Sequence, residues 1–270
     1  MFESLEVNDM NPTVRALFHT IRVHMGLSIA RPMFQFIIWI SPLFLATISF
    51  FIYGTESPDK VFQYVVLGSG FMALWSSIVY SSASDVNRER YYGTLEIIFV
   101  SPTSFSIILV GKIIGNTIWG LLSMVISFVY LVLIFRIEIA IHHPLYFIGS
   151  LLFVLFALSV FSFFLSLAFT LSRQAEALMN FIEYPIYLIC GFLFPVAILP
   201  FWIKPISFLL PPTWAIDLLR KVTMENANLL LIGKPLIALL ILTVVYVVLG
   251  IFCYKAVEKK ARIIGKLGVY

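Results

Sequence analysis

Long apolar runs alternate with short polar segments along this chain. Crossing about 30 Å of hydrocarbon at about 1.5 Å per residue takes about 20 apolar residues in a helix. Six segments meet or approach this length, namely 33–53, 61–82, 107–135, 145–171, 177–194 and 235–254. The pattern therefore predicts an all-α membrane protein in which six transmembrane helices form one domain over residues 1–270.

The composition agrees with this class. The chain has 270 residues, of which 61% are hydrophobic and 12% are charged, too few charged groups to cover a water-soluble protein of this size. The formal charge of +4 comes from short basic clusters beside apolar runs, so no nucleic-acid partner is expected. Cys190 and Cys253 both lie in apolar runs, and neither a disulfide framework nor a metal site is predicted.

The basic residues also predict an orientation, because Lys and Arg near span ends are retained on the cytoplasmic side. With the N-terminus inside, twelve of the 18 Lys and Arg fall in inner segments and six in outer segments. The outer six are Lys60, Arg136, Lys204, Arg220, Lys221 and Lys234. We therefore expect both termini in the cytoplasm and a multi-pass protein of the plasma membrane.

Residues 11–31 precede the first span and have a helical pattern of their own. Asn11 is a suitable N-cap and Pro12 suits a first helical turn, and apolar residues recur on one face. We expect an amphipathic helix in the cytoplasmic membrane interface, separated from the first span at Arg31–Pro32. The alternative is a simple extension of the first span. His19 and His24 are expected to be interfacial polar residues.

The stretch "SDVNRERYYGTLEIIFV" (84–100) concentrates charge between two apolar runs. Its apolar residues follow helical spacing, which predicts an amphipathic helix over 85–100 that is too short to cross the membrane. "VSPTS" then predicts a turn into the next span, where Gly111 and Gly115 allow close helix packing. One interpretation is a solvated connector, and the other is a docking element for a soluble partner, since two tyrosines and two carboxylates exceed what a connector needs.

Five prolines divide the apolar residues between 195 and 212 into pieces too short to span the membrane. Broken helices at membrane depth are tolerated where protein buries them or where they line a cavity. We infer a re-entrant pair of short helices within 195–230, on the outer side, followed by "TWAIDLLRKV" along the surface. The alternative is a proline-rich outer loop without a gating role.

Glu183 and Pro185 interrupt the span 177–194. An ionised carboxylate at a helix centre costs about 2.5–3.5 kcal/mol on insertion scales. We expect Glu183 to face a translocation pathway or a dimer seam, or to reach the inner headgroup region.

Three function classes fit a small membrane domain: a transport subunit, an autonomous secondary transporter or channel, and a membrane-embedded enzyme. A secondary transporter normally carries several ionisable residues in its spans, and here only Glu183 is convincing. His142 and His143 are the best enzymatic candidates, but adjacent histidines point to different helix faces. A loop is therefore favoured for them.

Two motifs bear a resemblance to a known family. The segment "RERYYGTLEIIFVSPTSFSIILVGKII" resembles the pattern of ABC transporter type-2 permeases, and "CGFLFPVAILPFWIKPISFLLPPTWAIDLLR" is similar to the proline-rich outer segment of their drug-export branch. The resemblance covers about residues 80–255. It implies a permease that dimerises with a second copy or a paralogue and pairs with two separate ATPase subunits to export an amphiphilic substrate such as a drug, lipid, glycan or peptide.

The resemblance also implies roles for particular residues. The chain has no G-x-x-x-x-G-K-[ST] phosphate loop, so the permease itself is not expected to be an enzyme, and ATP and Mg²⁺ would be bound by the partner ATPase in a bacterial plasma membrane. The implied ATPase-coupling residues are Arg88, Glu89, Arg90, Tyr91, Tyr92, Gly93, Thr94, Leu95 and Glu96. The implied outer gate comprises Pro195, Pro200, Pro205, Pro211, Pro212 and Trp214. Glu183 is not part of either motif.

Overall fold

Long apolar helices form a bundle in the computed structural model of this chain, which describes residues 11–138, 141–170 and 183–264. Among these residues, five helices are long and apolar enough to cross a membrane: Pro32–Tyr53, Pro58–Tyr91, Phe105–Phe135, Pro144–Thr170 and Leu229–Lys259. They confirm five of the predicted spans. The remaining one, 177–194, lies partly outside the described residues, and its described part is helical over 183–189. No strand occurs in the described ranges.

The first two spans contain π-helical segments. The first consists of α3 (Pro32–Gln35), π-helical Phe36–Ile40 and α4 (Ser41–Tyr53), and the second of α5 (Pro58–Lys60), α6 (Leu67–Trp75) and α7 (Ser81–Tyr91), joined by π-helical Val61–Val66 and Ser76–Tyr80. Such segments are rare and often mark functional sites. Because α7 continues the second span without a break, this span ends at Tyr91, beyond its predicted end at residue 82.

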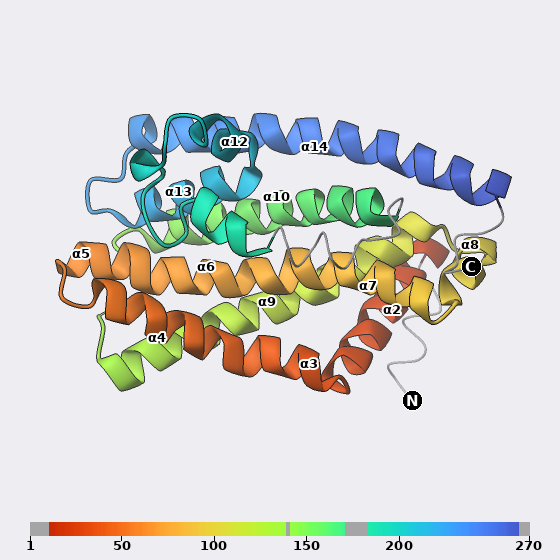
Figure 1. Cartoon of the computed structure of the whole chain (residues 1–270), viewed down its shortest axis with the longest axis horizontal. Coiled ribbons are helices and arrows are strands. Elements are labelled where there is room, and N and C mark those ends of the chain that lie inside the picture. Colours follow the sequence, from red (N-terminus) through yellow and green to blue (C-terminus); the bar gives the residue numbers. More distant parts are fainter. Residues whose placement is uncertain (1–10, 139–140, 171–182, 265–270) are drawn as a thin grey trace.

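The second span is the centre of the bundle. In its most apolar stretch, 89% of the residues are buried, whereas in that of α14 (Leu229–Ile264) only 17% are buried. In Figure 1, α6 runs through the middle of the molecule. The Phe71 and Phe192 rings meet at 4.8 Å between centroids, with Trp75 beside Phe192. The outward faces of α4 and α14 remain apolar and exposed, as lipid-facing surfaces are.

The N-terminal helix α2 (Pro12–Ile29) packs on α9 (Phe105–Phe135). The Asn11 side chain accepts a hydrogen bond from the Thr13 amide at 3.1 Å, and Arg31 is extended before Pro32, which confirms the predicted cap and break. A Cβ at Gly111 would lie 2.8 Å from Thr20, and one at Gly115 2.9 Å from His24. The two glycines therefore allow the close approach of α2.

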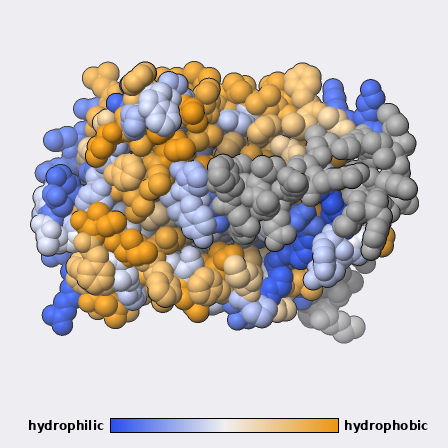
Figure 2. Space-filling view, viewed as in Figure 1, coloured by the Kyte–Doolittle hydropathy of each residue, from blue (hydrophilic) through white to orange (hydrophobic). Residues whose placement is uncertain are grey.

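Polar residues gather at the two ends of the bundle. One end holds α2, α7, α8 (Thr94–Val100) and the last turns of α14, and we call it the α8 end (Figure 1). The other holds α5, α12 (Lys204–Leu209) and α13 (Pro211–Thr223), and we call it the α13 end. Figure 2 shows hydrophilic surface at both ends of the described part and hydrophobic surface between them, the distribution expected of a multi-pass membrane protein.

The proline-rich segment forms short helices. A 3₁₀ turn at Val196–Ile198 follows Pro195, and α12 and α13 follow in turn, each shorter than a span. The prediction that residues 213–222 lie along the surface is wrong, because α13 packs between α10 (Pro144–Thr170), α14 and α6. Its apolar residues cover more than one face, and ten of its 13 residues are buried.

Candidate functional site

A buried carboxylate connects three helices at the α8 end. Asp85 of α7 is 0% exposed, and its Oδ1 lies 3.3 Å from Arg31 Nη1 and 2.6 Å from Arg88 Nη2. Its Oδ2 accepts a hydrogen bond from Asn116 Nδ2 on α9 at 3.0 Å and lies 3.2 Å from His24 Nε2 on α2. We call these five residues the Asp85 cluster. It joins α2, α7 and α9 through one charged group.

His24 is a structural member of this cluster. The ring is buried, and Nε2 lies 3.0 Å from Asn116 Oδ1. His24 lies on the side of α2 away from Arg15 and Arg22, and Gly115 leaves room for its ring to pack against α9. A polar side chain is buried here because the neighbouring helix supplies hydrogen-bond partners.

A second ionic contact connects α7 to the next span. The Glu89 carboxylate forms an ion pair with Lys112 of α9 and accepts a hydrogen bond from the Thr94 hydroxyl at the start of α8. Arg90 is buried and donates to the main-chain carbonyl of Thr170 at the end of α10. Of the predicted coupling residues, Glu89, Arg90 and Thr94 therefore hold the end of α7 in place.

The predicted single helix over 85–100 is divided into two. The helix α7 ends at Tyr91 and α8 begins at Thr94. Gly93 lies between them at φ 70°, in the left-handed region that favours glycine, and a Cβ there would meet nothing within 4 Å. Charged residues before Gly93 thus belong to the second span, and only the residues after it form a separate short helix.

Three large side chains project from this bend. Tyr91 is 78% exposed, Tyr92 68% and Ile97 69%, and the two tyrosine rings meet edge to face with 5.7 Å between centroids. Leu95 is 1% exposed and packs in a small core with Val86, Leu109 and Ile113. Leu95 therefore attaches α8 to the bundle and is not itself available to a partner. The side chain of Glu96 lies outside what the structure describes.

Glu183 is half-buried and has hydrogen-bond partners from its own chain. Its Oε1 accepts hydrogen bonds from Ser76 Oγ at 2.7 Å and from Tyr187 Oη at 3.0 Å. Ser76 begins the π-helical segment of the second span, which orients this hydroxyl. Pro185 follows within the helical stretch 183–189.

At the α13 end, the predicted outer-gate residues mostly lie at helix starts. Pro195 precedes the 3₁₀ turn, Pro205 is in the first turn of α12, and Pro211 and Pro212 begin α13, while Pro200 follows the 3₁₀ turn. The Trp214 indole donates to the Phe208 carbonyl at 2.8 Å, and the two rings lie 5.4 Å apart between centroids. These contacts join α12 to α13.

The two adjacent histidines have main-chain partners. His142 Nδ1 lies 3.1 Å from the carbonyl oxygen of Thr223, and His143 Nε2 lies 3.2 Å from that of Glu225. They connect the loop before α10 to the loop after α13. Within the described residues, no group of three or more His, Cys, Asp or Glu side chains is placed to hold a metal ion.

Comparison with known proteins decides the family. Residues 40–252 match the model of a family described as ABC-2 family transporter protein, and this region includes most of the bundle, the α7–α8 bend and the proline-rich segment. The chain belongs to the ABC-2 transporter family. The resemblance seen in the two sequence motifs is thereby confirmed.

Relatives of this ABC-2 permease include two curated proteins from Escherichia coli strains K12 and O157:H7. Each is named "Probable multidrug ABC transporter permease YbhR" and is 26% identical to this chain over 160 residues. The match covers 58% of this chain and 43% of each relative. This chain therefore aligns with less than half the length of these relatives.

The sequence motifs of the permease did not reveal its buried polar contacts. Asp85 lies in the charged stretch 84–100 and Arg31 at the predicted break before the first span, but neither was predicted to be part of a buried ionic contact, and Asn116 was not singled out. Arg220 was counted as an outer charge, yet its three guanidinium nitrogens donate to main-chain carbonyls of Gln63, Gly191 and Phe192 at 2.7–3.0 Å. The signal that could have identified these residues is a charged or amide group inside a run predicted to be buried.

Proposed function

We propose that this ABC-2 permease is the membrane subunit of an ATP-driven exporter and that its α8 end docks on a separate ATPase. The observation that carries the proposal is the surface formed by Tyr91, Tyr92 and Ile97, which are all exposed at the polar end of a transmembrane bundle. We call these three residues the docking surface. Aromatic side chains dominate protein interfaces energetically when a partner buries them.

The docking surface is supported by buried contacts that reach several helices. Glu89 connects the bend to α9 through Lys112, and Asp85 connects α7 to α2 and α9. A displacement of α8 by a partner would therefore be resisted by, and passed to, the helices that cross the membrane. Such a connection is what a coupling element requires, because allosteric effects travel through contiguous contacts between elements with discrete arrangements.

The partner would supply the ATP chemistry. The family relationship implies association with ABC ATPase subunits in general, and this chain has no phosphate-loop motif of its own. We propose two ATPase subunits, which bind ATP and Mg²⁺, and a dimer of permeases, identical or paralogous, surrounded by membrane lipid. The α8 end and both termini then face the cytoplasm.

The substrate is proposed to be an amphiphile, such as a drug, lipid, glycan or peptide. The two relatives are named as probable multidrug ABC transporter permeases. The bundle also presents apolar surfaces along which an amphiphile could move. We propose that Glu183 and Pro185 lie beside this path and that the α12–α13 segment with Pro195, Pro200 and Trp214 forms its outer gate.

Replacing both Tyr91 and Tyr92 with Ala is expected to remove the docking surface and leave the fold intact, since both side chains are exposed. We expect the variant to reach the membrane in normal amounts and to lose ATP-driven export. It should retain less than about a tenth of the ATPase on co-purification, because the loss of aromatic anchors costs about 2 kcal/mol or more of binding free energy. The control is Phe201→Ala, which removes one ring, 84% exposed, at the α13 end. Wild-type ATPase recovery with the double variant would overturn the proposal.

A further inference from the structure

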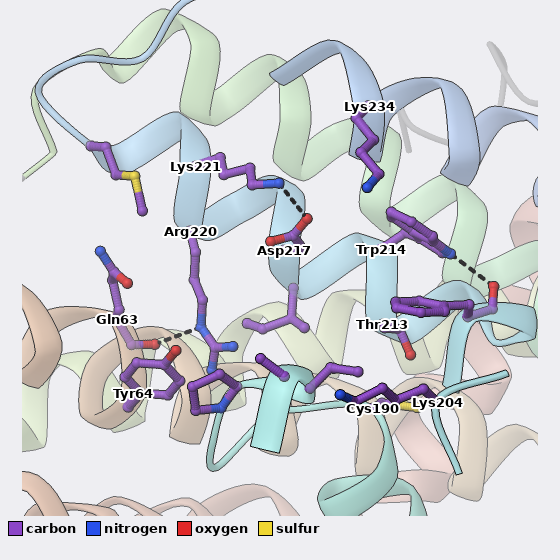
Figure 3. A pocket seen from close by; sticks show the side chains of 16 residues that line it. Gln63, Tyr64, Cys190, Lys204, Thr213, Trp214, Asp217, Arg220, Lys221 and Lys234 are labelled. Carbon is purple, nitrogen blue, oxygen red and sulfur yellow. Dashed lines mark hydrogen bonds and ion pairs between the residues drawn. The ribbon is translucent and has the colours of Figure 1, made fainter. Parts of the chain in front are cut away.

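A cavity of about 410 Å³ opens at the α13 end, far from the docking surface (Figures 1 and 3). Its wall is formed by α13, by the start of the second span at Gln63 and Tyr64, by Cys190 and the segment 195–197, by α12 and by Lys234 near the start of α14. Its size falls within the range of small-molecule sites, about 300–1,000 Å³. It is therefore large enough for a lipid headgroup or a small organic anion.

The lining of this cavity is strongly basic. Four cations, Lys204, Arg220, Lys221 and Lys234, line it together with a single acid, Asp217. The Asp217 carboxylate is already paired with Lys221, at 2.8 Å between Oδ2 and Nζ. Arg220 donates only to main-chain carbonyls, which satisfy its hydrogens without cancelling its charge. An excess of positive charge therefore remains inside the cavity.

Two of these cations have no counterion among the residues that the structure describes. Among the described residues, neither the Lys204 nor the Lys234 ammonium has a hydrogen bond or an ion pair. Lys204 comes from α12 and Lys234 from α14. Figure 3 shows the two lysines on opposite sides of the cavity, with Trp214 drawn between them. Two ammonium groups that line one hollow from different helices, with one paired acid beside them, are typical of an anion site.

The surroundings of the cavity favour an amphiphile over a fully soluble anion. Exposed apolar side chains lie next to it in the chain, including Ile198, Phe201, Trp202 and Leu209, and Phe208 and Trp214 form part of its wall. In membrane proteins, Trp and Tyr are enriched at the two ends of the transmembrane helices, where their rings lie at the level of the lipid headgroups. A ligand with its anionic group among the lysines would have apolar surface beside it for an acyl chain.

We propose that this cavity binds the phosphate group of an anionic amphiphile, with Lys204 and Lys234 as the ligand-contacting cations. Arg220 and the Lys221–Asp217 pair shape the wall and contribute to the positive potential. The apolar surroundings favour a membrane phospholipid as the source of the phosphate. A soluble organic phosphate would be recognised by the same chemistry, and the test distinguishes the two sources. The inference does not depend on the ATPase partner.

The test uses the purified full-length permease in a neutral detergent, without ATPase. The probes are short-chain phosphatidylglycerol, short-chain phosphatidylcholine and inorganic phosphate, and the readouts are the binding constant and the shift in melting temperature. We expect the wild type to bind phosphatidylglycerol at least tenfold more tightly than phosphatidylcholine. The double variant Lys204→Gln/Lys234→Gln should lose that preference and keep its melting temperature without ligand.

The matched control is Lys60→Gln/Lys255→Gln, which removes the same charge from exposed positions outside the cavity and should bind as the wild type does. If inorganic phosphate binds as tightly as phosphatidylglycerol and is lost in the same variant, the anion site is supported and its source is a soluble phosphate. Equal binding of the two lipids by the wild type would overturn the proposal. So would unchanged phosphatidylglycerol binding in the Lys204→Gln/Lys234→Gln variant.

Discussion

Replacing Asp85 with Asn is expected to destabilise the α8 end more than any other single charge removal in the described chain. The carboxylate is fully buried and faces the Arg31 and Arg88 guanidinium groups, which would be left without their counterion. Removing one partner of a buried ion pair costs about 3–5 kcal/mol. We expect a large fall in melting temperature in detergent and faster proteolysis within α2, which loses its connection to α7.

The matched control for Asp85 is Glu56→Gln. Glu56 pairs with Lys60 at 2.9 Å, but both side chains are about half exposed, and exposed pairs contribute about 0–1 kcal/mol. We expect the free energy of unfolding of this control to differ from that of the wild type by no more than about 1 kcal/mol. If Asp85→Asn and Glu56→Gln melted together, the Asp85 cluster would not be the attachment of α2.

Replacing Arg220 with Met is expected to unfold the proline-rich segment at the α13 end. Its guanidinium donates to three main-chain carbonyls, of Gln63, Gly191 and Phe192, and lies over the Tyr64 ring at 4.2 Å. Each carbonyl left unsatisfied in the interior costs about 1–3 kcal/mol. Burial lowers the pKa of Arg220 to about 10, so the group is still protonated at neutral pH.

The measurement for Arg220 is thermal melting in detergent together with the accessibility of a cysteine introduced at Ser207, which is buried beside Thr213. We expect Arg220→Met to lower the melting temperature and to expose that cysteine to a thiol reagent. Lys221→Met is the control, since Lys221 makes one partly exposed ion pair with Asp217. Melting of Arg220→Met at the temperature of this control would contradict the role of Arg220.

Local patterns in the sequence predicted the elements that depend on local rules. Asn11 and Pro12 marked the start of α2, Pro32 marked the start of the first span, and the apolar runs marked five membrane helices, because caps, prolines and span lengths act within a few residues. The Gly111–Gly115 pair similarly indicated where another helix approaches. What a helix packs against is a separate question, to which local patterns give no answer.

The buried polar contacts could not be predicted because they join residues distant in the sequence. His24 and Asn116 are 92 residues apart, and the helical pattern of α2 does not show which helix packs against His24. The burial of α13 likewise depends on α10 and α14, and its charged Arg220 is accommodated by carbonyls that local propensity does not reveal. The bend at Gly93 required a positive φ, for which the glycine was the available signal.

Site-specific photo-crosslinking in cells tests directly whether the docking surface contacts a separate ATPase. A photoreactive amino acid would replace Tyr92, and in a parallel strain Phe201, which is more exposed and lies at the α13 end. We expect position 92 to crosslink to a protein whose peptides include the G-x-x-x-x-G-K-[ST] phosphate loop, and position 201 not to do so. Crosslinking of that ATPase from position 201, or its absence from position 92 while the chain still drives ATP-dependent export, would show that the ATPase does not dock on α8.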